Sequence, residues 1–212
     1  MLILHVLFAA AQFVVVRDDA VKPPMFTAIV ADDPPAITIS LGNFHLLTLR
    51  DVVSFEEAKT TAQRWPVPAA IDTRSVAIWQ RRPDLSYEPA GPRIRRDEEA
   101  YVHFDVYAFL PGHEQEAEAL TKEYVDVDRA AGVRHRWEIY EVVVGADVPA
   151  FVLVTPARSR SDYEAEKLAA DKLRDNRDLP LHARTTKLLR RIESFDGTIR
   201  QRRAVQRSLT TN

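Results

Sequence analysis

The chain has 212 residues, of which 46% are hydrophobic and 28% charged, with 29 basic and 31 acidic residues and no cysteine. This composition is ordinary for a soluble globular protein of one large domain or two small ones. The formal net charge of −2 excludes a globally basic protein that coats phosphates. The lack of cysteine excludes disulfides, thiol catalysis and thiolate metal sites.

The first residues, MLILHVLFAAAQ, form a short apolar segment that contains the stretch Ala9–Ala11. The alanines resemble a signal-peptidase site, but the basic residues that normally precede a leader are missing. The segment is shorter than the ~20 residues that span a bilayer. We therefore expect a buried first element in a cytoplasmic protein without membrane contact; export by a leader is the alternative.

The first half of the chain then shows strand and helix signals. Met25–Ser40 predicts a strand, an acidic proline-containing turn and a second strand. Phe55–Lys59 opens a helix after Ser54, because serine is a favoured N-terminal cap. Ser75–Arg82 ends this half as a strand.

The start of the first half has two interpretations. Either Leu2–Asp19 is a first helix and the opening strand is missing, or Leu2–Phe8 is that strand and the helix is stunted. We favour the missing strand, because it aligns the first half with the second without gaps. Asn43–Arg50 then has no counterpart in the second half.

The second half gives clearer signals. Tyr101–Leu110 alternates with period two and is a strand, and an amphipathic helix follows it. Arg134–Pro156 predicts a hairpin, and Ser159–Asp175 predicts a second helix with a serine cap. A further helical piece over about Leu181–Ile192 follows. A turn at the start of Phe195–Arg203 and a final strand in that segment complete a β-α-β-β-α-β order, the ferredoxin-like unit.

Landmarks of the second half recur in the first. Ile-x-Gln-Arg-Arg occurs at Ile78–Arg82 and at Ile199–Arg203, and Phe55–Lys59 resembles Tyr163–Lys167. Pro35 and Ala36 likewise align with Pro149 and Ala150. Landmarks in the same order predict one structural unit written twice.

We therefore predict an α+β protein of two ferredoxin-like repeats: residues 1–90, with an incomplete start, and residues 101–212, joined by a charged, proline-rich linker over 91–100. Helices cover only one face of each sheet, so the bare faces should pack sheet to sheet as a pseudo-dimeric α+β barrel. The chain would be a monomer of this kind or a homodimer.

Alternation along the strand Tyr101–Leu110 separates two rows of side chains. The aliphatic and aromatic row should pack on the helices, and the mixed row should face a ligand space between the two sheets. The first row is Val102, Phe104, Val106 and Ala108, and the second is Tyr101, His103, Asp105 and Tyr107.

The stretches VHFDVYAFLPGHEQEAEAL and YEVVVGADVPAFVLVTP resemble the dimeric α+β barrel superfamily. This superfamily includes NIPSNAP-like proteins, antibiotic-biosynthesis-type monooxygenases and haem-degrading relatives. The resemblance is best from Tyr101 to Lys167 and implies the barrel fold. It transfers no catalytic residue to this chain.

His103 and Asp105 are the candidate catalytic residues, because both point to one face of a strand about 7 Å apart, given a rise of ~3.3 Å per residue. Candidate ligand-binding residues share the expected inter-sheet space. They are Tyr101, Tyr107, Glu138, Tyr140, Trp79 and Arg200.

Cofactor and nucleic-acid signals are weak. His113 and Glu116 are two ligands without a third, so no metal site is expected. The arginine-rich stretches are interrupted by acids and lack an RNA-recognition signature, so no nucleic-acid partner is expected. Haem, with His103 or another histidine as axial ligand, is a minor alternative to the absence of a cofactor.

The sequence thus favours a barrel that holds a small apolar or aromatic molecule between its sheets. The reaction would resemble that of a cofactor-independent monooxygenase, with His103 as base or orienter and Asp105 as its partner. The alternative is a non-catalytic structural or interaction module in which the two sheets simply bury each other.

Overall fold

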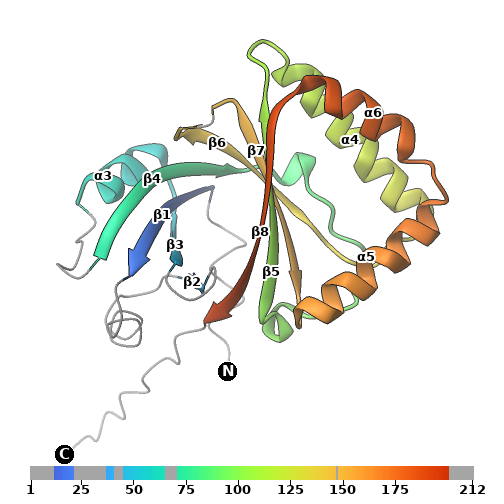
Figure 1. Cartoon of the computed structure of the whole chain (residues 1–212), viewed down its shortest axis with the longest axis horizontal. Coiled ribbons are helices and arrows are strands. Elements are labelled where there is room, and N and C mark those ends of the chain that lie inside the picture. Colours follow the sequence, from blue (N-terminus) through green and yellow to red (C-terminus); the bar gives the residue numbers. More distant parts are fainter. Residues whose placement is uncertain (1–11, 22–36, 41–44, 65–70, 147, 201–212) are drawn as a thin grey trace, which may run out of the picture.

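The computed structural model describes residues 12–21, 37–40, 45–64, 71–146 and 148–200. Eight strands form one closed antiparallel barrel in the order β1-β3-β2-β8-β5-β7-β6-β4, and helices cover its outside (Figure 1). The strands are β1 (Phe13–Val21), β2 (Ile37–Ser40), β3 (His45–Val52), β4 (Ile71–Arg81), β5 (Tyr101–Phe109), β6 (Glu138–Val144), β7 (Ala150–Ala157) and β8 (Leu189–Arg200).

The helices are α3 (Phe55–Arg64), α4 (Glu114–Ala131), α5 (Arg160–Arg174) and α6 (Leu179–Leu188), with single 3-10 turns η1 (Pro83–Leu85) and η2 (Arg96–Glu98). Helices α4, α5 and α6 form an arc over the outer face of the C-terminal strands, and α3 lies on the N-terminal strands (Figure 1). Within the described residues, no helix has the length and apolar character needed to cross a bilayer.

Local sequence sets the ends of these helices. The hydroxyl of Ser54 accepts the backbone N–H of Glu57 at the start of α3, and Ser159 accepts that of Asp162 at the start of α5. Such caps satisfy N–H groups that have no partner within the helix. At the end of α4, Gly132 adopts φ 69°, a left-handed conformation that glycine takes without steric cost.

The two halves of the barrel have the same strand order. The N-terminal half runs β4-β1-β3-β2 and the C-terminal half runs β8-β5-β7-β6, which is last, first, third and second strand in each case. The halves join where β2 pairs with the end of β8 and where β4 pairs with β6. The helix-free faces of the two sheets therefore face each other, as the α+β barrel prediction requires.

The prediction of a missing opening strand is wrong. Phe13–Val21 is the first strand of the N-terminal half, at the place that Tyr101–Phe109 holds in the C-terminal half. His45–Val52 is the third strand, so Asn43–Arg50 does have a counterpart, in Ala150–Ala157. The valine run that begins at Val14 suits a strand buried on both faces, because such strands need no polar row.

Other sequence predictions in the first half meet the structure only in part. The helix at Phe55 and the strand through Ile78 are confirmed. Pro35 and Ala36, the first strand expected within Met25–Ser40, and Leu2–Phe8 lie outside the described residues.

The final strand also begins earlier than predicted. β8 starts at Leu189 and runs without interruption through Asp196 and Gly197, which the sequence suggested as a turn. The last helix accordingly ends at Leu188 rather than Ile192. Pairing of Val102 with Gly197 and of Asp105 with Ser194 holds this segment against β5.

Two hydrophobic cores lie on opposite sides of the C-terminal sheet. The core inside the barrel contains Val14, Val16, Leu47, Leu49, Trp79, Val102, Phe104, Ala108, Tyr140, Val142, Ala150 and Val152. The core between the sheet and the helices contains Leu85, Tyr87, Phe109, Ala117, Leu120, Val125, Val133, Trp137, Ile139, Phe151, Ala170, Leu181 and Leu188. A smaller core under α3 contains Val15, Val52, Ala58 and Ile78.

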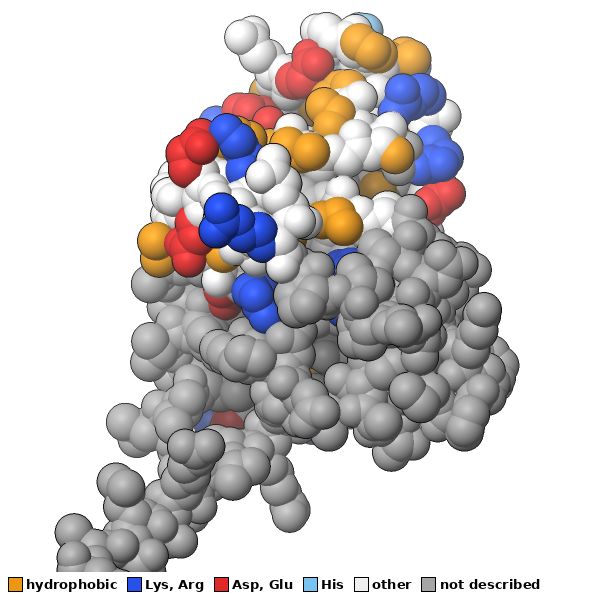
Figure 2. All heavy atoms as spheres, turned by 90° about the vertical axis from the view of Figure 1, so that its left-hand side faces the viewer, with side chains coloured by type: hydrophobic (Ala, Val, Ile, Leu, Met, Phe, Trp, Pro, Cys, Tyr) orange, Lys and Arg blue, Asp and Glu red, His pale blue; other side chains and the backbone are white. Residues whose placement is uncertain are grey.

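Charged side chains of both signs lie side by side on the described part of the face that Figure 2 shows. Figure 2 shows basic and acidic groups intermingled there with hydrophobic ones. On this part of the surface the charges therefore form a mixed pattern rather than a patch of one sign.

Candidate functional site

A cavity of about 740 Å³ lies between the outer face of the C-terminal sheet and helices α4, α5 and α6. Its volume falls in the range of small-molecule sites, about 300–1,000 Å³. Much of its wall is aromatic or aliphatic, and these lining residues are Tyr107, Phe109, Leu120, Tyr124, Trp137, Ile139, Phe151, Leu153, Tyr163, Leu189 and Ile192.

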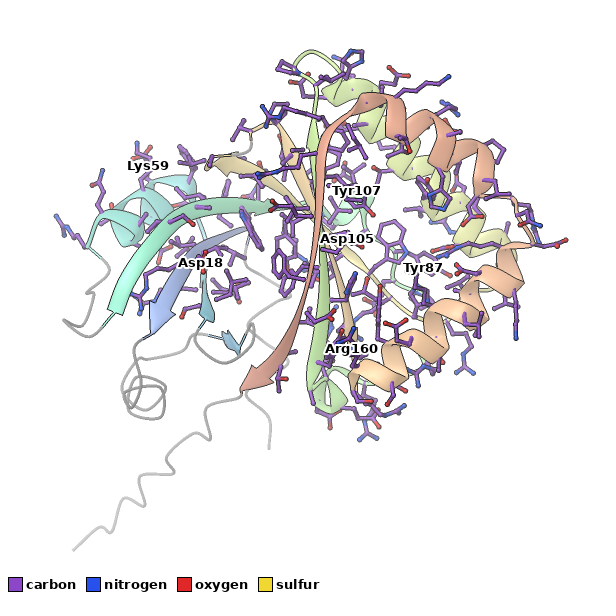
Figure 3. All side chains as sticks on the ribbon, viewed as in Figure 1. Asp18, Lys59, Tyr87, Asp105, Tyr107 and Arg160 are labelled. Carbon is purple, nitrogen blue, oxygen red and sulfur yellow. The ribbon has the colours of Figure 1, made fainter. Side chains whose placement is uncertain are left out.

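The cavity is on the opposite side of the sheet from the one the sequence suggested. Val102, Phe104 and Ala108 point into the barrel core, while Asp105 and Tyr107 line the cavity under the helices. Figure 3 shows Asp105 and Tyr107 on β5, on the side that faces the helices. Alternation identified the two rows correctly, but their assignment to the two faces was inverted.

His103 lies between two carboxylates on this outer face. Its Nδ1 is 2.7 Å from Oδ1 of Asp196 on β8, and its Nε2 is 3.3 Å from Oδ1 of Asp105 on the same strand. Carboxylates only accept hydrogen bonds, so each ring nitrogen must donate. Tyr101 donates to the same Asp196 oxygen, and Ser194 donates to the same Asp105 oxygen.

This network favours the charged forms of His103, Asp105 and Asp196. Burial by itself lowers the pKa of His103, but the hydrogen bonds and charges of Asp105 and Asp196 outweigh burial and raise that pKa. Burial by itself raises the pKa of Asp105, but His103, Ser194 and the charge of Lys167 hold it below its usual value. At neutral pH, Asp105 is therefore an ionised carboxylate on the wall of the cavity.

Helix α5 packs over this network through Tyr163. The ring of Tyr163 stacks on His103, with ring centroids 4.4 Å apart and an interplanar angle of 22°. Tyr163 also lines the cavity, as does Lys167 one helical turn later. His103 itself is not a lining residue, and its hydrogen bond to Asp105 connects it to the cavity wall.

The other end of the cavity contains a buried ion pair. Asp128 on α4 accepts hydrogen bonds from Nε of Arg174 at 2.6 Å, from its Nη2 at 3.0 Å and from Nε1 of Trp137 at 2.8 Å. These bonds tie α4, α5 and the segment before β6 together. They keep the helices at a fixed separation from the sheet at this end.

His135 is a second histidine of the cavity. Burial lowers its pKa to about 4, a shift opposed by the charge of Asp128 and reinforced by that of Arg174. The imidazole is therefore neutral at physiological pH. Within the described part of the chain it makes no hydrogen bond, so a ring nitrogen can act as a Lewis base toward a ligand.

Several predicted ligand-binding residues lie inside the barrel instead. Trp79 and Tyr140 are core residues whose rings are 6.1 Å apart, and the Tyr140 hydroxyl donates to Glu138. Glu138 pairs with Arg81 at 3.3 Å and with Arg96 at 3.0 Å. These three predicted residues thus face the space between the two sheets, as expected, and pack there against each other and against Arg81. Their binding of a ligand stays a prediction.

The remaining sequence candidates are peripheral. Tyr101 packs with Tyr163 and Ala157 beside the cavity but not on its wall. Arg200 continues the β8 ladder opposite Thr38, and its side chain lies outside the described residues. His113 and Glu116 are exposed at the start of α4, 3.4 Å apart.

Among the described residues, no group of three or more histidine or acidic side chains is arranged around a metal position. Sequence reasoning missed Ser194, Asp196 and His135 as members of the site. Ser194 and Asp196 could have been found if β8 had been extended back to Leu189, because the register then places them opposite Asp105 and His103.

Comparison with protein-family models and with curated proteins gives no match. Solved structures do match over nearly the whole chain. An anthrone oxidase-like protein is 13% identical, with a TM-score of 0.61 over 90% of this chain and 92% of that one. A Fusobacterium nucleatum protein named as a monooxygenase is 9% identical, with a TM-score of 0.52 over 91% of this chain and 94% of that one.

A mutant chlorite dismutase from Candidatus Nitrospira defluvii is also 9% identical, with a TM-score of 0.59 over 92% of this chain and 94% of that one. Identities this low show a shared fold only. The chain thus has the ferredoxin-like, dimeric α+β barrel fold that its sequence resembled.

Proposed function

We propose that the chain binds a small, largely aromatic molecule in the cavity under its C-terminal helices and oxidises it with O2 without a cofactor. The observation that carries this proposal is the Asp105 carboxylate, which is ionised by its network and shares the cavity wall with Tyr107 and other aromatic side chains. A base in an apolar site can remove a proton from a substrate whose carbanion is stabilised by aromatic rings. The names of two structural neighbours, an anthrone oxidase-like protein and a monooxygenase, agree with this chemistry.

Anthrone illustrates the reaction with balanced atoms. Asp105 takes a proton from the methylene carbon, and the electron pair left on that carbon reduces O2 as a carbon–oxygen bond forms. The resulting peroxide takes the proton back. The remaining hydrogen on that carbon then leaves as a proton while the O–O bond breaks, which gives anthraquinone and water.

In this proposal Asp105 is the catalytic base and His103 positions it. The sequence offered His103 as base or orienter, and the role of orienter fits a ring whose two nitrogens both face carboxylates. The Tyr107 hydroxyl is a donor for the oxygen anion of the substrate, and its raised pKa, caused by burial and by the charge of Asp105, keeps its proton on.

The test is oxygen uptake with anthrone as the probe, followed by the absorbance of anthraquinone. Wild type should consume O2, and Asp105→Asn should lose at least 100-fold of the rate, the usual contribution of a general base. Asp126→Asn is the matched control, because Asp126 is exposed on α4 and pairs with Arg129. Binding without oxygen uptake would refute catalysis and favour the non-catalytic alternative.

We also propose that the barrel is a tandem repeat of one unit, with residues 1–90 and 101–212 as its copies. The identical strand order of the two halves supports this, together with the repeated Ile-x-Gln-Arg-Arg motif. Under this proposal one chain forms a complete pseudo-dimer. The resemblance to NIPSNAP-like proteins stays a prediction.

Haem binding is the second candidate function, favoured by one specific observation. His135 is neutral, lines the cavity and stands among aromatic walls that could sandwich a flat macrocycle. His103, the ligand suggested first, is engaged by two carboxylates and does not fit this role. A bound haem would supply iron-based redox chemistry.

Titration of the protein with haem tests this candidate. A shifted Soret band that disappears in His135→Ala but persists in His103→Ala would support it. An unshifted band in wild type would rule it out.

A further inference from the structure

We infer that the ligand of this cavity is a fused aromatic compound that carries a hydroxyl group next to a carboxylate or another acidic group. The inference rests on the proposed function and names its substrate class. It follows from the polar atoms around Asp105 that the protein leaves unpartnered.

The first such atom is an acceptor. Oδ1 of Asp105 receives both hydrogen bonds of its network, from His103 and from Ser194. Within the described residues, both hydrogen bonds of Asp105 go to Oδ1, which leaves Oδ2 without one on the cavity wall. An ionised oxygen in a largely apolar site calls for a donor from the ligand, such as a hydroxyl.

Two hydroxyl donors share the cavity wall with this acceptor. The charge of Asp105 contributes to the raised pKa of both Tyr107 and Tyr163, after the larger effect of burial, so both phenols lie within its field. In the described structure neither phenol donates to a protein acceptor, and both line the cavity. They can therefore donate to an oxygen of the ligand.

A cation completes the set. Lys167 lines the cavity, and its charge lowers the pKa of Asp105, so the ammonium lies on the same side as that carboxylate. Among the described residues it has no ion-pair partner. The other lining cations are already bonded: Arg93 to Asp162 and Glu166, Arg134 to the carbonyl of Gly91, Arg136 to Glu99, and Arg174 to Asp128.

Together, the acceptor, the two donors and the cation indicate which groups the ligand carries. A ligand hydroxyl that donates to Asp105 needs an adjacent acceptor that meets Lys167 and the two phenols. An anion without that hydroxyl would leave Asp105 and the ligand charge repelling each other. The apolar part of the wall around Phe151 and Leu153 then packs against the fused rings.

Four naphthalene probes separate these contributions: 1-hydroxy-2-naphthoate, 1-methoxy-2-naphthoate, 2-naphthoate and 1-naphthol. Affinities are measured calorimetrically on the full chain. The hydroxy acid should bind about tenfold or more tightly than each of the others, since each lacks one charge-assisted contact. Equal affinities for all four would overturn the inference.

Variants assign the contacts. Lys167→Met should weaken the hydroxy acid about tenfold and leave 1-naphthol unchanged, and Lys172→Met, on the same helix outside the cavity lining, is the control. Asp105→Asn should reduce the advantage of the hydroxy acid over its methoxy analogue. The inference would be overturned if Lys167→Met and Asp105→Asn both kept the preference for the hydroxy acid. Binding of 1-naphthol in that case would leave the proposed function standing. Failure of every probe to bind would count against the proposed function itself.

Discussion

The ring of Tyr163 on α5 lies parallel to the ring of His103 on β5, with their centroids 4.4 Å apart. This contact fastens a helix to the sheet directly beside the cavity. It also covers a charged imidazole with an aromatic face, an arrangement that is favourable for a cation.

Replacement of Tyr163 tests how much this stacking contact stabilises the fold. Tyr163→Ala should lower the free energy of unfolding by about 3 kcal/mol, because a buried aromatic side chain is lost. Tyr163→Phe keeps the stack and should stay within about 1 kcal/mol of wild type. Urea denaturation measures both, and equal losses in the two variants would show that the hydroxyl rather than the stacked ring matters.

His103 should make stability depend on pH. Its pKa is raised in the folded state, so its contribution is fully present below the pKa of an unfolded histidine, about 6.5, and is lost as pH rises through the folded value. At pH 6, His103→Gln should cost about 2 kcal/mol, as expected for hydrogen bonds to charged groups. Urea denaturation at pH 6 and at pH 9 should show a smaller difference at pH 9.

The groups that face His103 define the control for this prediction. They are Asp105, Asp196, the ring of Tyr163 on α5, and Thr155 on the neighbouring strand β7. The two carboxylates are in turn contacted by Tyr101 and Arg160, which bind Asp196, and by Ser194, which binds Asp105, while the charge of Lys167 acts on Asp105. Asp196→Asn removes the closest carboxylate and should lower the pKa of His103, which NMR of the imidazole nitrogens measures directly. An unchanged pKa of His103 in this variant would contradict the placement of its ring between two carboxylates.

The Asp128–Arg174 pair should behave as a buried ion pair. Asp128→Ala leaves the guanidinium and the Trp137 indole without their acceptor and should cost about 3–5 kcal/mol. The double variant Asp128→Ala, Arg174→Met should recover part of this loss, because it no longer buries an unpaired charge. Chemical denaturation of the four members of the cycle checks the coupling, and simple additivity would contradict it.

Filling the cavity tests its position. Leu153→Trp places a larger side chain on the cavity wall opposite the helices and should weaken ligand binding about tenfold or more while the chain stays folded. Leu153→Met is the volume-matched control and should bind normally. Unaltered binding in the tryptophan variant would place the ligand elsewhere.

Asp51 inside the barrel should also make stability fall as pH rises, in this case because a buried acid is more stable with its proton on. Burial raises its pKa to about 7, opposed by Arg81 and reinforced by Glu138. The folded state therefore binds a proton more tightly than the unfolded state, and stability falls as pH rises from about 4 to 7. Asp51→Asn should gain about 2 kcal/mol at pH 8 and little at pH 4, as measured by urea denaturation. A uniform gain at both pH values would show another cause.

The sequence predicted the strand and helix pattern of the C-terminal half well, because Tyr101–Phe109 alternates strictly and the helices carry clear caps. It also predicted the closed sheet-to-sheet arrangement. It could not assign the faces of β5, since alternation shows which residues share a face but not which face the helices cover. The all-apolar row that contains Phe104 packs inside the barrel against Trp79 and Phe195.

The sequence identified only part of the site, for a related reason. Asp105 and Tyr107 were found because they share a strand face. Ser194, which binds Asp105, comes from β8, and Tyr163, which stacks on His103, comes from α5. Only the strand register and the helix packing bring them to the site. The segment before Asp196 carries arginines and exposed positions that resemble a helix end, which hid the start of the strand.

Closure of the barrel at two seams, β2 with β8 and β4 with β6, has a consequence for how the molecule assembles. Each sheet finds its covering surface within the same polypeptide, so dilution cannot separate the two layers as it separates the subunits of a weak complex. A fragment limited to the C-terminal half would keep its helices but expose the face that carries Val102 and Phe104 to water. Such a fragment would need a second molecule to bury this face. In the full chain the N-terminal half buries it instead.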